Sequence, residues 1–425
     1  MRVALIGSGG REHAIAYKIS ESDKLKTLYC LPGNPGTAQF GQNIELKTNN
    51  EILKFCKDNE INLVIVGPEQ PLVEGICDLL RENNILAFGP SKSAAQIEGD
   101  KTFSKLLMKK YNIPTASFEV FDKEDYDKAI SYLETRSYPI VIKASGLAAG
   151  KGVLICNNIG EGQNAIQECF RNSTFGEAGD KIIIEEFMVG QEASIFAITD
   201  GNDFVILPPA QDHKRIYDGD LGKNTGGMGA YAPAPLITEI LLKEIAEKII
   251  SPTLEALKAE GIMYNGCLYA GIMITNEGPK VVEYNCRFGD PETQCVLPLL
   301  DGDLLELFLS VANGRINKTA VKYSGGSSVC VVTVSGGYPE IFEKGFVISG
   351  INNIKDERII IYHAGTKVNN DILLTNGGRV LGVTSNIIEN NITLAKEIVY
   401  EALSKINYDG IFYRKDISDK AYLKP

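Results

Sequence analysis

Residues 139–153 read PIVIKASGLAAGKGV, and this stretch decides how the middle of the chain folds. An apolar run typical of a buried strand ends at Lys143, and a loop of small residues then runs from Ser145 to Gly152. Because such a loop has little side-chain bulk, it can fold over a polyphosphate and offer backbone N–H groups, with Lys143 and Lys151 as point charges. It is not a Walker A loop, because a glycine follows Lys151 where that motif has Ser or Thr. A surface hairpin without a ligand is the alternative for a loop of this kind considered alone.

A second segment, IIIEEFMVGQEAS, places polar residues where a strand leaves its sheet. Glu185, Glu186 and Met188 lie at this strand end, where backbone groups are free to bind the edge of an adenine ring. Phe187 is expected to pack, and Glu192 can accept hydrogen bonds from ribose hydroxyls. Two solvated acids at the end of a strand are the alternative interpretation.

A third segment, VVEYNCRFGDPETQ, has the residues expected of a metal site. Glu283 and Asn285 are two positions apart on a strand, so they project from one face, and both offer oxygen ligands suited to Mg²⁺. Arg287 follows as the chain leaves the strand, and its planar guanidinium can bind a substrate carboxylate through two hydrogen bonds. An exposed edge strand is the alternative.

The first hundred residues alternate strands and helices. Apolar runs predict strands over 2–6, 27–30, 62–66 and 85–88, which end in the turns GSGG, PGNPGT, GPEQP and GPSKS. In a parallel doubly wound sheet these turns meet at the carboxyl ends of the strands, where ligands bind. A dinucleotide site is weakly supported, because Glu12 occupies the third glycine position of G-x-G-x-x-G and the second strand ends without an acid. A site for another phosphate stays open.

From about residue 101 the pattern changes. We predict helices over 101–111, 162–171 and 238–259, and strands over 139–143, 152–155, 181–186, 193–199, 267–275 and 279–284, with a long loop rich in glycine and proline over 208–235. Beyond about residue 320, a strand over 328–335, the motifs HAGT and NGGRV and a final helix predict a small α/β domain.

Composition narrows the class of protein. At about 100–200 residues per domain, 425 residues predict roughly two to four domains. The chain has no run of roughly 18 apolar residues and no signal-peptide pattern, and its nine scattered cysteines suit reduced cytosolic thiols. A net charge of −11 argues against a broad nucleic-acid surface. The chain has three histidines and contains neither G-x-S-x-G nor H-E-x-x-H, the motifs of serine hydrolases and zinc proteases. Carboxylates, lysines, arginines and backbone amides are therefore expected to carry the catalytic chemistry.

Together these segments resemble the ATP-grasp ligases, and the match narrows to the glycinamide ribonucleotide synthetase family. The motifs that carry it, in order, are GSGGREH, PGNPGT, GPEQPLVEG, IKASGLAAGKGV, IEEFMVGQEAS, QDHKR, NTGGMGAYAPAP, EYNCRFGDPETQ, HAGT, TNGGRVL and YRKDI, which span nearly the whole chain. The resemblance implies an α/β and α+β multidomain fold. Its parts are a Rossmann-like parallel-sheet domain (1–100), an ATP-grasp clamp of two subdomains (101–320, with a mobile lid over about 115–190) and a small C-terminal α/β domain (321–425).

The resemblance also implies an activity. A cytoplasmic enzyme of purine synthesis would join glycine to 5-phosphoribosylamine through glycyl phosphate, with ATP as co-substrate and Mg²⁺ or Mn²⁺ as cofactor. Small molecules would be its partners, without nucleic acid or membrane, and a monomer is expected although the sequence leaves the oligomeric state open. The alternatives are another ATP-grasp carboxylate–amine ligase or carboxylase, and a nucleotide sensor without turnover.

The resemblance implies ligand-binding roles for the residues of this sequence that match the family motifs. ATP would be bound by Lys105, Lys143, Ser145, Gly146, Gly150, Lys151, Gly152, Glu185, Glu186, Phe187, Met188 and Glu192. The metal would be bound by Glu283 and Asn285, and glycine by Asp212, Arg287 and Gly289, with Arg287, Asp212 and Lys143 as the catalytic groups. Sheet geometry assigns phosphoribosylamine to Gly9, Gly10, Arg11, Gly33, Asn34, Gly67, Pro68 and Glu69. Arg11 would either add charge to this phosphate site or form a structural salt bridge.

The strand that precedes the metal pair departs from the wider ATP-grasp pattern. Many ATP-grasp proteins place another metal carboxylate on that strand, whereas residues 268–275 contain none and have Gly271.

Overall fold

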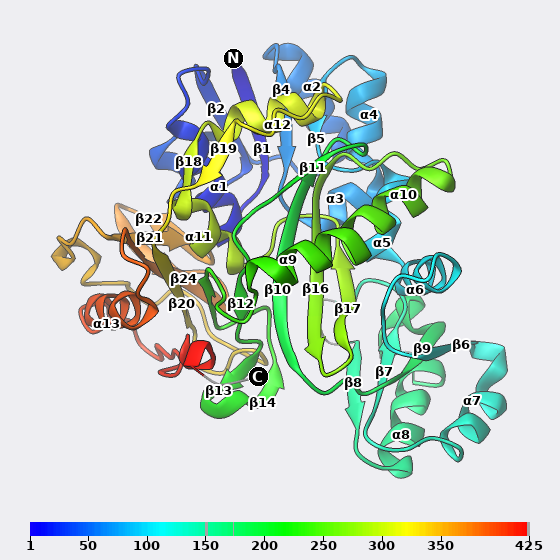
Figure 1. The fold of residues 1–425 in the computed structure, drawn as a ribbon. Coiled ribbons are helices and arrows are strands. Elements are labelled where there is room, and N and C mark those ends of the chain that lie inside the picture. Colours follow the sequence, from blue (N-terminus) through cyan, green and yellow to red (C-terminus); the bar gives the residue numbers. More distant parts are fainter. Residues whose placement is uncertain (149–151, 173, 423–425) are drawn as a thin grey trace.

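The computed structural model describes residues 1–148, 152–172 and 174–422 (Figure 1). Its N-terminal part is a five-stranded parallel sheet in the order β3-β2-β1-β4-β5. The strands are β1 (Arg2–Gly7), β2 (Thr27–Pro32), β3 (Gln42–Asn43), β4 (Leu63–Val66) and β5 (Leu86–Phe88). The helices are α1 (Gly10–Ser20), α2 (Asn49–Asp58), α3 (Glu69–Glu74), α4 (Ile76–Glu82) and α5 (Lys92–Gly99). The predicted Rossmann-like parallel sheet is confirmed.

The central part of the chain consists of two sheets. The first has the order β6-β9-β7-β8, with β6 (Phe118–Asp122), β7 (Ile140–Ala144), β8 (Val153–Cys156) and β9 (Lys181–Glu186). Helices α7 (Tyr126–Leu133) and α8 (Ile159–Phe170) pack on it. The second has the order β11-β10-β16-β17, with β10 (Gln191–Thr199), β11 (Phe204–Ile206), β16 (Gly266–Thr275) and β17 (Gly278–Asn285). Residues 187–190 join the two sheets, which form the two-part clamp expected of the fold.

Helices connect these sheets to the rest of the molecule. Helix α6 (Lys101–Lys110) starts where the N-terminal part ends. The helix predicted over 238–259 is α9 (Glu239–Ile245), a π-helical turn, η5 (Ala246–Ile250), and α10 (Ser251–Ala259) in succession. After β17, α11 (Glu292–Val296) packs against the start of the chain, and α12 (Leu304–Ala312) packs on the N-terminal sheet. Phe308 of α12 stacks on Phe88 of β5, with ring centroids 4.1 Å apart.

The last part of the chain and two short strands from residues 211–232 form one sheet, the C-terminal sheet, in the order β12-β15-β20-β24-β21. Its strands are β12 (Gln211–Asp212), β15 (Gly229–Ala232), β20 (Ser327–Val334), β21 (Ile359–His363) and β24 (Arg379–Ile387). The paired short strands are β13 (Arg215–Tyr217) with β14 (Leu221–Asn224), β18 (Leu300–Gly302) with β19 (Val321–Tyr323), and β22 (Thr366–Asn369) with β23 (Ile372–Thr375), and α13 (Ile392–Leu403) packs on β20 and β24.

The predicted loop over 208–235 is wrong in one respect. It contains β12 to β15, and β15 pairs with β20. These strands are only two to four residues long, and β15 also has a partner about a hundred positions along the chain, so a local pattern could not show them. As a result, Asp212 is held on the C-terminal sheet.

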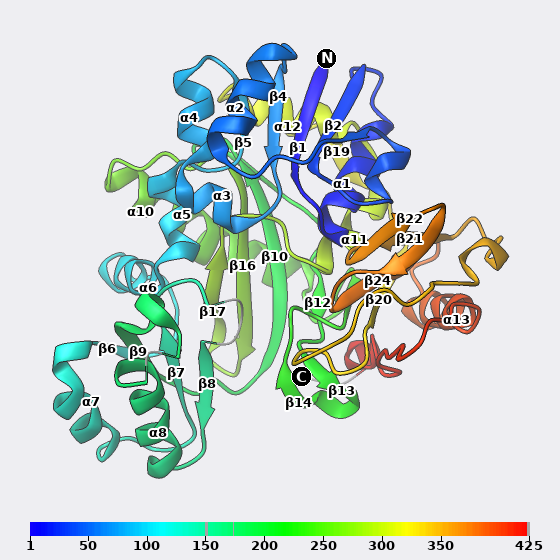
Figure 2. The same ribbon diagram turned by 180° about the vertical axis from the view of Figure 1, so that it is seen from behind.

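Helix α1 and helix α11 lie side by side where the N-terminal part meets the C-terminal sheet (Figure 2). This junction brings the carboxyl ends of β1 and β4 close to the segment after β17. Across the described residues, every helix is too short or too polar to span a lipid bilayer.

Candidate functional site

The two predicted phosphate lysines lie on either side of one carboxylate. Lys105 comes from α6, Lys143 from the end of β7 and Glu185 from the neighbouring strand β9. Glu185 Oε1 lies 3.2 Å from Lys105 Nζ, and Glu185 Oε2 lies 3.0 Å from Lys143 Nζ. All three side chains are buried, and burial lowers the pKa of Lys105 to about 8 although Glu185 opposes this shift. The structure thus places two ammonium groups beside one carboxylate, and Glu185 is their counter-ion rather than a side chain open to a nucleoside.

Lys143 also connects the two sheets of the clamp. Its ammonium donates a hydrogen bond to the carbonyl of Val282 on β17 at 3.1 Å. Lys105 donates to Thr115 Oγ1 at 2.6 Å, and that hydroxyl donates to the carbonyl of Val281 at 2.7 Å. The lysines are therefore held beside the strand that carries Glu283.

The start of the glycine-rich loop is fixed to the beginning of α6. Ser145 Oγ donates to Asp100 Oδ1 at 2.7 Å and accepts from the N–H of Thr102 at 3.0 Å. Lys101 Nζ donates to the carbonyl of Gly146 at 2.9 Å. These contacts commit the Ser145 hydroxyl to the protein.

Glycine is required at both described ends of this loop. A Cβ on Gly146 would lie 2.8 Å from Ala178 Cα, and one on Gly152 would lie 2.7 Å from Ala148 Cβ. Gly150 and Lys151, which we also assigned to ATP, lie outside the described residues.

The segment after β9 leaves the first sheet as expected. Glu186 Oε1 accepts from the N–H of Ser117 at 2.9 Å, and Glu192 Oε2 accepts from Lys214 Nζ at 2.5 Å. Met188 is partly buried. Phe187 is 38% exposed, because residues 187–190 belong to neither sheet, and its packing in the nucleotide site stays a prediction.

Glu283 and Asn285 lie on one face of β17, as the spacing predicted. Burial alone would raise the pKa of Glu283, but Lys214, Lys143 and Lys101 lower it on balance, so the side chain is a carboxylate at neutral pH. Gly271 pairs with Glu283 on the adjacent strand. No group of three or more His, Cys, Asp or Glu side chains gathers as a metal site within the described ranges. One carboxylate and one amide oxygen suit Mg²⁺ that takes its other ligands from phosphates and water.

Asp212 lies near a second buried carboxylate. Burial raises the pKa of Asp212 to about 7; Glu292 and Glu192 act in the same direction, whereas Lys214 and Lys420 oppose it. Glu292 accepts hydrogen bonds from Tyr269 Oη at 2.7 Å and Ser194 Oγ at 3.1 Å. Sequence reasoning missed Glu292 and Lys214, although both lie within motifs we used, FGDPETQ and QDHKR.

Gly289 lies directly against Glu292. A Cβ on Gly289 would collide with the Glu292 carboxylate, so this position leaves no room for a side chain. The predicted glycine residue Gly289 and the buried acid Glu292 therefore form one compact unit at the start of α11.

The guanidinium of Arg287 is held by two acids. Arg287 Nη2 lies 2.9 Å from Glu98 Oε1, and Arg287 Nε lies 3.3 Å from Glu69 Oε2. Glu98 Oε2 also accepts from the N–H of Cys286 at 2.7 Å. Because Glu69 was assigned to phosphoribosylamine and Arg287 to glycine, the structure makes the two predicted sites neighbours. Glu98 lies in α5, which carried no motif, and was missed.

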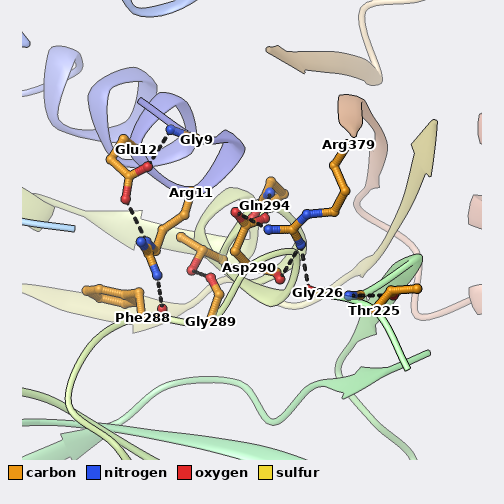
Figure 3. Close-up of polar contacts among 12 residues, drawn as sticks. Gly9, Arg11, Glu12, Thr225, Gly226, Phe288, Gly289, Asp290, Gln294 and Arg379 are labelled. Carbon is orange, nitrogen blue, oxygen red and sulfur yellow. Dashed lines mark hydrogen bonds and ion pairs between the residues drawn. The ribbon is translucent and has the colours of Figure 1, made fainter. Parts of the chain in front are cut away.

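The GSGG turn has an internal anion at the start of α1 (Figure 3). The N–H of Gly9 donates to Glu12 Oε2 at 2.6 Å, and Glu12 Oε1 lies 2.7 Å from Arg11 Nε. Arg11 Nη1 also donates to the carbonyl of Phe288 at 3.0 Å. The structural salt bridge is thus the alternative that Arg11 adopts, and Glu12, at the third glycine position, occupies the helix N-terminus.

Gly10 faces α11 rather than open space. A Cβ on Gly10 would lie 2.5 Å from Gln294 Nε2. The Gly9 N–H and the Cα of Gly10 are therefore both in contact with protein groups, and the expected approach of a phosphate to them would require Glu12 and Gln294 to move.

Other residues assigned to phosphoribosylamine hold the junction together. The side-chain amide of Asn34 donates to the carbonyls of Ser8 and His363, both at 2.8 Å, and so ties the N-terminal turns to the HAGT motif. Gly33 has a φ of 72°, a left-handed conformation that favours glycine. Gly67, at the end of β4, lies against Glu12, and Pro68 precedes α3.

The pKa of Asp212 predicts how glycine use depends on pH. If Asp212 binds the ammonium of glycine, only its ionised form is effective, so kcat/KM for glycine should rise as the pH increases through about 7. Steady-state rates measured between about pH 5 and 9 would test this. Lys420 lowers the pKa of Asp212, so Lys420→Met should move the rise to higher pH. A flat profile through pH 7 in both proteins would contradict contact between Asp212 and the ammonium.

Comparisons with known proteins agree along the whole chain. Three family models match in order: "Phosphoribosylglycinamide synthetase, N domain" over residues 1–98, the "ATP-grasp (A) domain" over 99–293 and the "C domain" over 328–420. A phosphoribosylamine–glycine ligase from Caldanaerobacter subterraneus subsp. tengcongensis is 46% identical over 98% of this chain and 99% of its own.

Solved structures give the same result. A phosphoribosylamine–glycine ligase from Thermotoga maritima has 34% identity and a TM-score of 0.84, and the match covers 98% of this chain and 100% of that one. A biotin carboxylase from Campylobacter jejuni, 16% identical, has a TM-score of 0.74 over 97% of this chain and 93% of its own, a likeness of fold alone.

Proposed function

The chain belongs to the phosphoribosylglycinamide synthetase family, and from this premise we propose that it joins glycine to 5-phosphoribosylamine, converting ATP to ADP and phosphate. The observation that best supports the proposal is the surroundings of Glu283. Three lysines from different segments, Lys101, Lys143 and Lys214, act on this one carboxylate. An ionised acid among cations is the arrangement needed to bind a metal–polyphosphate complex.

In the proposed reaction, a carboxylate oxygen of glycine attacks the γ-phosphorus of ATP, and ADP leaves. The product is glycyl phosphate. The amine of phosphoribosylamine then attacks the acyl carbon, phosphate leaves, and the nitrogen loses a proton, which gives the amide glycinamide ribonucleotide. The protein contributes by orienting the three reactants and by neutralising negative charge.

Named residues supply these contributions. Lys105 and Lys143 would neutralise the phosphates of ATP, and Glu283 and Asn285 would hold Mg²⁺ or Mn²⁺. The bound metal would screen the charge that develops on the transferred phosphoryl group. Asp212 would bind the ammonium of glycine and Arg287 its carboxylate.

The assignments to individual ligands are part of this proposal, as are the domain limits at residues 100 and 320 and a lid over about 115–190. We also propose a cytoplasmic enzyme that acts on small molecules as a monomer, without nucleic acid or membrane as partners.

The proposal predicts the substrate dependence of ADP formation. ADP should appear at a useful rate only when Mg²⁺, glycine and freshly prepared phosphoribosylamine are all present, because glycine is the acceptor of the γ-phosphoryl group and phosphoribosylamine must consume glycyl phosphate before the next turnover. A coupled ADP assay with each component omitted in turn tests this. Equal rates with bicarbonate in place of glycine would indicate a carboxylase, and nucleotide binding without turnover would indicate a sensor; either result would overturn the proposal.

A further inference from the structure

Arg379, the first residue of β24, reaches from the C-terminal sheet to the segment that carries Arg287 and Gly289 (Figure 3). Its Nη1 donates to the backbone carbonyl of Asp290 at 2.7 Å, and its Nη2 lies 2.9 Å from Asp290 Oδ2. It therefore holds both the main chain and the side chain of this residue. The motif TNGGRVL helped to identify the family, but the proposed function gives Arg379 no role.

The same guanidinium holds a second segment. Arg379 Nη1 also donates to the carbonyl of Gly226 at 2.6 Å. A Cβ on Gly226 would lie 3.1 Å from Arg379 Cζ, so a glycine lets the planar group lie close to the backbone. The N–H of Gly226 in turn donates to Tyr338 Oη at 3.1 Å, so C-terminal residues bind both polar groups of this glycine.

The loop at residues 225–227 is hydrogen-bonded to the segment that carries Asp212, the other residue proposed to bind glycine. The N–H and the hydroxyl of Thr225 both donate to the carbonyl of Lys214, each at 2.8 Å. Lys214 is two residues after Asp212. On the opposite side, Gly227 lies against Pro291, where a Cβ would collide. Gln294 Nε2 donates to Asp290 Oδ1 at 2.6 Å and holds the acid in place from α11.

We propose that Arg379 is a positioning residue that fixes the segment bearing Arg287 and Gly289 relative to the loop joined to Asp212. This inference rests on the proposed function, because it assumes that these two segments bind glycine between them. The carboxylate and the ammonium of glycine would then be bound by groups from different sheets. The guanidinium of Arg379 forms hydrogen bonds to both segments and so fixes the distance between them. A misplacement of about 1 Å is enough to impair such binding.

Arg379→Lys is the test, because it keeps the charge and loses the fork of donors. KM for glycine should rise about tenfold or more, KM values for ATP and phosphoribosylamine should stay within about twofold, and kcat should change less than KM for glycine. In Arg379→Ala, added guanidinium ion should partly restore glycine use. Gly226→Ala should act in the same direction, since its Cβ would push the guanidinium away.

Arg81→Lys is the matched control. Arg81 Nη2 also donates to two backbone carbonyls, those of Ala87 at 3.1 Å and Gly89 at 2.6 Å, but both lie in the N-terminal part of the chain and outside the two glycine-binding segments. This variant should lower thermal stability and leave KM for glycine unchanged.

Three results would contradict the positioning role of Arg379 or the function on which it rests. If Arg379→Lys behaves like Arg81→Lys, with a lower melting temperature and normal KM for glycine, Arg379 is only structural and the inference is wrong. If KM for phosphoribosylamine rises instead, the guanidinium contacts that substrate itself, which also overturns the positioning role. If the wild-type chain shows no glycine-dependent ADP formation, the proposed function fails, whatever the variants do.

Discussion

Glu283→Gln is expected to lower kcat by at least about a thousandfold, which corresponds to roughly 4 kcal/mol of transition-state stabilisation. The substitution keeps the shape of the side chain but removes its charge. The three lysines that act on Glu283 would then face a neutral amide, and the proposed metal would lose its only carboxylate from β17. Turnover at saturating Mg²⁺ and ATP measures the effect, and circular dichroism shows whether the fold is retained.

Glu277→Gln provides a matched control for this variant. Glu277 lies in the turn between β16 and β17, where its exposed carboxylate is 2.6 Å from Lys280. The Glu277→Gln variant should turn over at the normal rate, since Glu277 lies at the far end of the hairpin from Glu283. Normal turnover of Glu283→Gln at saturating metal would show that β17 is not the metal site.

Arg287→Lys is expected to raise KM for glycine about a hundredfold, with a far smaller change in KM for ATP. A lysine ammonium cannot bond a carboxylate through two parallel N–H groups or bridge Glu69 and Glu98. Burial raises the pKa of Glu98, and Arg287 opposes this shift, so its loss would favour a neutral Glu98. Initial rates at varied glycine and fixed ATP measure the effect.

Arg358→Lys is the corresponding control, because Arg358 makes an exposed pair with Asp356 on the surface of the C-terminal part. It should leave both KM values unchanged. An unchanged KM for glycine in Arg287→Lys would place the carboxylate site elsewhere and assign Arg287 to the junction alone.

The sequence predicted those parts of the fold that depend on local patterns. The apolar run before GSGG is β1, and Glu283 and Asn285 of EYNCR share one face of β17. The sequence could not predict that β12 pairs with β15 and β15 with β20, because strands of two to four residues have no periodicity and β20 is distant from β15 in the chain. The π-helical turn in the helix over 238–259 was likewise missed, since the residues on both sides continue the helical pattern.

The candidate site was predicted as separate pieces. Motifs identified Lys143 and Glu185, and the family resemblance added Lys105, but only the three-dimensional structure shows that Glu185 lies between the two lysines. Glu12 was noted as a departure from a glycine motif, and its role as the anion at its own helix N-terminus needs the turn geometry. Glu98 had no signal at all, because an acid in an unremarked helix looks like any solvated residue.

The apolar interior of the β6–β9 sheet has consequences for how this enzyme can vary. Its buried side chains, among them Leu133, Ile142, Ile166 and Ile184, form a cluster separate from the two larger ones that serve the rest of the molecule. An exchange among these residues is compensated by their own neighbours and does not reach the junction around Arg379. These core positions can therefore exchange apolar side chains of similar volume independently, whereas Lys143 and Glu185 of the same sheet are held by contacts with α6 and β17.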